Sequence, residues 1–138
     1  MGCLKAGRGL WALGVGLILA MASPVSAHHS ASMFDRTKPK TLKGVVRDFA
    51  WTNPHASLTF VADPGTAEAG QIWVVELTSP GSLTRLGWTK RSLQGGDHVE
   101  VTLGPLRSGG PAGVMIRAKN LVTGATFAQG GPTYQEQQ

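Results

Sequence analysis

The sequence has little of the chemistry that cross-links or activates many small proteins. Its 138 residues include one cysteine, Cys3, and one tyrosine. A single cysteine excludes an internal disulfide, and it excludes a site built from several thiolates. Any stability must therefore come from an ordinary apolar core, and a metal site cannot be built on several thiolates.

The chain also lacks an apolar run long enough to span a bilayer comfortably. Its longest, residues 10–22 ("LWALGVGLILAMA"), falls short of the roughly 20 residues that a transmembrane helix needs. Lys5 and Arg8 precede this run, and the small residues Val25-Ser26-Ala27 follow it, which is the pattern of a secretory signal peptide. We predict cleavage after Ala27 and a periplasmic or secreted product; an uncleaved anchor is the alternative.

Catalytic motifs are missing as well. There is no G-x-S-x-G, H-E-x-x-H, phosphate loop or dinucleotide fingerprint, and no acidic pair at a spacing that specifies acid/base catalysis. The chain has 13 basic and 8 acidic residues, and two of the basic ones, Lys5 and Arg8, lie in the predicted signal peptide. The mature domain would then have a net charge of 11 minus 8, or +3. Such a mild charge is no nucleic-acid footprint. We predict a protein that is not an enzyme and whose partner is an envelope protein or polymer.

What is present is a series of short apolar alternations separated by glycine-rich turns, which predicts an all-β domain. Ser79 as N-cap, Pro80 at the first helical position and Gly87 as the stop predict one short helix. The expected strands cover residues 41–51, 55–63, 73–77, 99–103 and 114–122, with the helix at 79–88.

Three strands, a helix and two strands is the element order of a five-stranded OB-like barrel. Gly44 and a change of alternation phase before Phe49 predict a bulged, bent first strand, as a small barrel requires. A five-stranded sandwich is the alternative. The predicted organisation is a signal peptide (1–27), an N-terminal arm (28–40), the barrel (41–127) and a disordered tail (128–138).

Several short motifs together resemble a known family. They are "AHHS" at 27–30, "FD" at 34–35, "WTNPH" at 51–55, Trp73, Glu76 and "SP" at 79–80, "LGW" at 86–88 and "GDHVEV" at 96–101. In combination they are similar to the exported bacterial family catalogued as domain-of-unknown-function 6152. The resemblance implies an exported small β domain and supplies no reaction or ligand.

Two of the four histidines stand at the predicted cleavage site. A terminal His28 offers its α-amine and imidazole to one ion, and an imidazole from His29 or His55 completes a three-nitrogen set. Tetragonal nitrogen sites favour Cu(II), with Zn(II) as the nearest competitor. The structural explanation is that His28 and His29 keep the mature terminus soluble and that His55 bonds the Asn53 backbone in a turn. His98 is expected to point to solvent and to be the poorest ligand.

The other functional hypothesis is a metal-independent module for binding protein or polysaccharide. It uses the face of the second and third strands, where OB-folds bind ligands. The residues expected on that surface are Trp51, Asn53, Trp73 and Trp88. Their structural explanation is packing in the core, since Trp73 falls on the apolar face of its strand.

Overall fold

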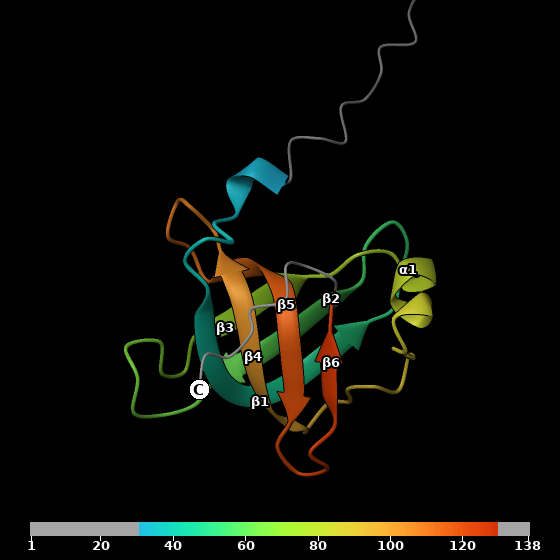
Figure 1. Ribbon diagram of the computed structural model, residues 1–138. Coiled ribbons are helices and arrows are strands. Elements are labelled where there is room, and N and C mark those ends of the chain that lie inside the picture. Colours follow the sequence, from blue (N-terminus) through green and yellow to red (C-terminus); the bar gives the residue numbers. More distant parts are fainter. Residues whose placement is uncertain (1–30, 130–138) are drawn as a thin grey trace, which may run out of the picture.

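The computed structural model describes residues 31–129 and shows a small barrel with an arm at one end (Figure 1). The predicted signal peptide, His28, His29 and residues 130–138 of the predicted tail lie outside the described residues. In chain order the elements are η1 (Ala31–Met33), β1 (Lys40–Ala50), β2 (Ser57–Ala62), β3 (Ile72–Glu76), α1 (Pro80–Arg85), β4 (His98–Pro105), β5 (Ala112–Asn120) and β6 (Thr126–Ala128).

The sheet closes on itself as the OB-like prediction requires. Its strand order is β3-β2-β1-β4-β5-β6, with antiparallel neighbours, and a parallel pairing of β3 with β5 completes a five-stranded barrel. The expected helix α1 lies between β3 and β4. The barrel prediction is therefore confirmed, and the sandwich alternative does not describe this chain.

The first strand bends so that it serves both sides of the barrel. β1 pairs with β4 over Lys40–Val45 and with β2 over Gly44–Ala50, and its register with β2 shifts between Val46 and Asp48. A Cβ on Gly44 would lie 2.2 Å from the Val61 carbonyl oxygen. The predicted glycine and bulge are thus both present, because the strands approach too closely here for any side chain.

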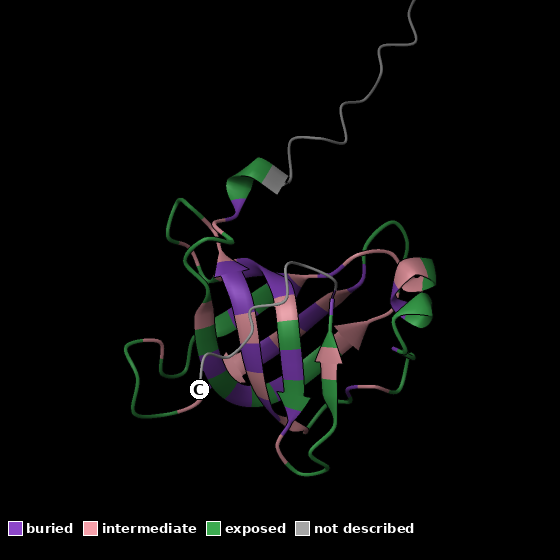
Figure 2. Cartoon of the chain, viewed as in Figure 1, coloured by how far each residue is buried: buried purple, intermediate pink, exposed green. Residues whose placement is uncertain are grey.

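The core is formed by alternating inward-facing residues of the strands, and Figure 2 colours the buried residues purple. Leu58, Phe60 and Val75 are fully buried, and Leu83 of α1 packs into the same cluster. Ser79 caps α1 by accepting a hydrogen bond from the Ser82 backbone N–H. The helix ends at Arg85, so Leu86 becomes its C-cap and is half exposed.

A sixth strand was not among the predicted elements. β6 adds to β5 outside the five-stranded barrel, and the indole N–H of Trp88 donates to the Ala128 carbonyl at 3.0 Å. The tail was predicted to begin at residue 128, yet Ala128 belongs to β6 and Gln129 is only 7% exposed. The segment is short and glycine-flanked, and one apolar residue, Phe127, is too weak a pattern to indicate a strand.

The described part of the N-terminal arm is docked on the loop between β4 and β5. Phe34 is buried and bridges to Leu106, and the Asp35 backbone N–H donates to the Pro105 carbonyl at 2.8 Å. The Arg107 backbone N–H in turn donates to the Met33 carbonyl at 2.8 Å. These contacts hold the arm beside one end of the barrel.

Candidate binding pocket at the end of the barrel

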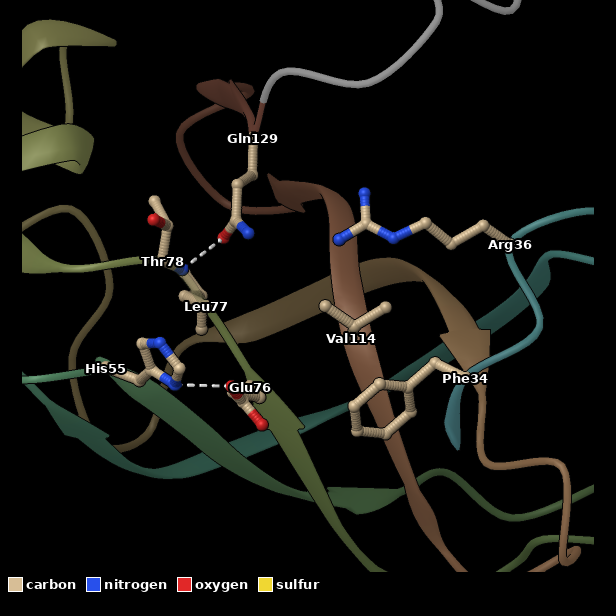
Figure 3. Close-up of a pocket in the computed structure, with 8 residues that line it drawn as sticks. All are labelled: Phe34, Arg36, His55, Glu76, Leu77, Thr78, Val114 and Gln129. Atoms are coloured by element: carbon tan, nitrogen blue, oxygen red, sulfur yellow. Dashed lines mark hydrogen bonds and ion pairs between the residues drawn. The ribbon is translucent and has the colours of Figure 1, made fainter. Parts of the chain in front are cut away.

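A pocket of about 180 Å³ opens between the docked arm and the ends of β3 and β6 (Figure 3). Its lining combines apolar walls with several polar groups, which is the usual composition of a small-ligand site. The lining residues are Phe34, Arg36, His55, Glu76, Leu77, Thr78, Val114 and Gln129.

An imidazole–carboxylate pair forms one side of this pocket. His55 Nδ1 lies 2.5 Å from Glu76 Oε1, and both side chains are partly exposed. Backbone bonds fix the two segments, since Ala56 donates to Thr78 at 3.1 Å and Leu77 donates to Ala56 at 2.9 Å. The ring therefore binds a carboxylate rather than the Asn53 backbone, and Nε2 is the nitrogen left for an external ligand.

A buried amide forms the upper side of the pocket in Figure 3. The Thr78 backbone N–H donates to Gln129 Oε1 at 3.0 Å, and this bond fixes the orientation of the carboxamide. The carboxamide nitrogen then faces the side of the pocket on which Arg36 lies. Sequence reasoning missed Gln129 because it placed the residue in the tail.

The arm supplies the third side. Phe34 presents its ring beside Val114, and the Arg36 guanidinium extends between Phe34 and Gln129. A Cβ on Gly104 would lie 3.1 Å from Arg36 Cγ, so the arginine stem passes close over this glycine. No sequence pattern connected these arm residues to His55, because the contact depends on the docking of the arm.

Next to the pocket, the same arm holds an ionised carboxylate. The Thr37 hydroxyl donates to Asp35 Oδ1 at 2.6 Å, and Arg107 lies 3.5 Å from the other oxygen. These contacts, the hydroxyl bond first, hold the pKa of Asp35 below its ordinary value. Asp35 therefore stays charged and holds the Arg107 side chain of the β4–β5 loop against the arm.

The predicted aromatic surface needs a correction. Trp73 is 4% exposed and Trp88 is 0% exposed, so neither can form a partner surface. Trp73 faces inward on β3, and Trp88 is enclosed between Phe49 and Phe127, with ring centroids 6.0 and 5.0 Å away. Of the four residues predicted on that surface, Asn53 is exposed and Trp51 is partly buried.

His98 is half exposed, as expected of a residue that points away from the core, but it also has a partner that the sequence did not indicate. Its Nε2 lies 2.5 Å from Asp63 Oδ2. His98 pairs across the sheet with the outward Val45, so this second imidazole–carboxylate pair lies on the outer wall of the barrel.

Of the three predicted metal ligands, only His55 can be placed. His28 and His29 lie outside the described residues. Within residues 31–129, no group of three or more histidine, cysteine, aspartate or glutamate side chains is close enough to hold a metal ion. Of the predicted ligands, the described residues thus provide His55 alone and not a complete metal site.

Comparison with known proteins gives one match. The model of DUF6152, a family of unknown function, matches residues 16–116. The chain belongs to DUF6152. Phe34, His55 and Glu76, which stand in the sequence motifs that suggested the resemblance, line the pocket together. The DUF6152 chain has no significant match among curated proteins or solved structures.

Within residues 31–129 of this DUF6152 chain, no helix is long and apolar enough to cross a membrane.

Proposed function

We propose that this DUF6152 chain is a periplasmic or secreted binding module, rather than an enzyme, and that it binds one Cu(II) ion beside the pocket. The ligands in this proposal are the α-amine and imidazole of His28 together with Nε2 of His55, with His29 as a further candidate ligand. The observation that carries the proposal is the His55–Glu76 pair beside the docked arm.

The pair has the arrangement that metal-binding histidines usually show. A ligating imidazole donates its other N–H to a carboxylate, which fixes the ring and makes the free nitrogen more basic. Glu76 accepts from His55 Nδ1 in this way and leaves Nε2 for the ion. Nitrogen ligands in a tetragonal arrangement favour Cu(II) over other divalent ions of the first transition row.

The arm limits how far the predicted terminus can lie from the pocket. Phe34 is buried at the pocket, and five residues separate it from His28. A chain of six residue steps spans at most about 20 Å, and η1 shortens this span, so the amine of His28 lies no farther than that from Phe34. The docking of Phe34 is therefore the structural condition that the copper proposal requires.

The test is a Cu(II) titration against a competing chelator, using protein that begins at His28. We expect a one-to-one complex, which a one-residue N-terminal extension weakens more than about 100-fold because the amine moves away from the imidazole. His55→Gln should weaken it at least about tenfold. His98→Gln, which alters the pair on the outer wall, is the matched control and should change nothing. Equal affinity with and without the extension discards the proposal.

A second candidate function is metal-independent binding of a protein on the outer face of β1–β3. Val45, Ile72 and Val74 are exposed there, and the register aligns Val45, Val61 and Ile72 in one row. This surface is aliphatic, whereas sugars stack on aromatic rings, so it suits a protein better than a polysaccharide. The exposed cations Lys43 and Arg47 beside Val45 favour a partner with an acidic rim.

A photo-crosslinking residue placed at Ile72 in the exporting cell tests this candidate, with Val122 as the exposed control site. We expect a discrete protein adduct from position 72 only, which added chelator leaves intact and which Val74→Lys abolishes. Identical adducts from both positions, or an adduct with polysaccharide or lipid alone, would contradict it.

A further inference from the structure

The side of the pocket opposite the histidine pair has a different chemistry. There the Arg36 guanidinium and the Gln129 carboxamide face the same space (Figure 3). We propose that the pocket binds a small organic carboxylate that carries a hydrogen-bond donor, a hydroxyl or an ammonium group, at its other end. The inference concerns the same pocket as the copper proposal but does not depend on it, since neither Arg36 nor Gln129 is a copper ligand.

The carboxylate binds at the Arg36–Gln129 side. Gln129 is more than nine-tenths buried, and its oxygen is already used by the Thr78 N–H, so its nitrogen can only donate into the pocket. Arg36 adds a positive charge to the same side of the pocket, which attracts an anion. An amide donor and a cationic side chain therefore line the same side of the pocket.

The other end of the ligand meets acceptors. Glu76 lies in the same lining beside His55, and its carboxylate oxygens are hydrogen-bond acceptors. A second carboxylate placed here would be repelled, whereas a hydroxyl or ammonium group would donate to Glu76. The pocket therefore discriminates between the two ends of its ligand.

Size and wall chemistry limit the ligand further. A volume of about 180 Å³ is small against the roughly 300–1,000 Å³ of typical ligand pockets. Phe34 and Val114 provide an apolar wall between the two polar ends. The ligand class that fits is a short hydroxy acid or amino acid. Such a molecule is smaller than a sugar chain and, unlike a bare inorganic anion, carries a donor for Glu76.

Amide chemical shifts of the isotope-labelled mature protein, recorded with a chelator to keep it free of metal, provide the test. The probes are glycolate, glycine, acetate and succinate. We expect saturable shifts around Thr78 and Gln129, with glycolate or glycine binding several-fold more tightly than acetate and succinate binding weakest. Arg36→Gln should weaken binding about tenfold or more, and Lys38→Gln is the control that removes the same charge from the same arm.

Three results would overturn this inference. They are succinate binding as tightly as glycine, equal binding by the Arg36→Gln and Lys38→Gln proteins, and the absence of saturable shifts with all four probes. A Gln129→Leu variant provides a second check, because it removes the amide donor without changing the charge. None of these outcomes bears on copper, which is measured separately through the N-terminal extension.

Discussion

The two imidazole–carboxylate pairs of this chain have the same nitrogen–oxygen distance, through Nδ1 of His55 and Nε2 of His98, but different surroundings. His55–Glu76 and His98–Asp63 both have a nitrogen–oxygen distance of 2.5 Å, and their histidines are similarly exposed, at 49% and 45%. The first lies in a pocket with Arg36, Gln129 and the docked Phe34. The second lies on the outer wall, beside the outward Val45 of β1.

This comparison shows that the pair alone does not define a site. A half-exposed ion pair contributes about 0–1 kcal/mol to stability wherever it lies. What distinguishes His55 is the set of groups from the arm, β3 and the end of β6 that converge beside it. The pairs therefore act as matched controls for each other in the predictions below.

The largest effect should come from breaking the barrel that both pairs share. Gly44→Ala places a Cβ 2.2 Å from a backbone oxygen, so β1 and β2 must separate. We expect a loss of about 3 kcal/mol or more in the free energy of unfolding, measured by urea denaturation. Gly81→Ala is the control, because nothing lies within 4 Å of its added Cβ. Equal stability of the two variants would show that β1 is not held as described.

The next largest effect should distinguish His55, beside the docked arm, from His98 on the outer wall. Phe34→Ala removes the buried side chain that anchors the arm, and we expect a loss of about 2–4 kcal/mol. Amide shifts should change around His55 and stay the same around His98. Met33→Ala, at a neighbouring residue that is 49% exposed, should have little effect on either measurement. Changes that spread equally to both histidines would argue against local docking.

A smaller effect distinguishes the roles of the two carboxylates. Glu76→Gln should weaken Cu(II) binding about tenfold, since it removes the negative charge that makes the imidazole basic. Asp63→Asn makes the same chemical change on the outer wall, and its Cu(II) affinity should equal that of the unmodified protein. Competition titration measures both. Equal losses in the two variants would mean that the effect comes from overall charge.

The smallest effect concerns Asp35, whose partner is a hydroxyl and not an imidazole. Because contacts in the folded state lower the pKa of Asp35, its ionised form stabilises the fold above the unfolded-state value of 3.8. That stabilisation is lost as the pH falls through 3.8 and below. Thr37→Val should move the Asp35 midpoint up toward 3.8 in a carboxyl NMR titration, and an unmoved midpoint would contradict the assigned cause.

Strand alternation was sufficient to predict most of the barrel. The inward residues Leu58, Phe60 and Val75 follow from period-2 patterning, and the bend of β1 follows from Gly44 and the phase change before Phe49. β6 could not be predicted in this way because its stability comes from pairing with β5 and from the Trp88 indole, contacts between distant parts of the chain.

The pocket was predicted only in part. His55 was named from its position after a turn, but its partner Glu76 lies on another strand, and single-sequence patterns carry no information on such pairing. Arg36 and Gln129 join the site only because the arm and β6 pack beside the barrel end. Trp73 and Trp88 were proposed for a surface on composition, and tertiary packing placed both in the core.

The copper proposal is tested most directly by the intact mass of the protein recovered from the exporting cell, recorded under native conditions with and without added Cu(II). The account predicts a polypeptide that begins at His28 and retains one copper ion per chain, which His55→Gln loses and His98→Gln keeps. A chain that begins at any other residue, or one that retains no copper, would contradict it.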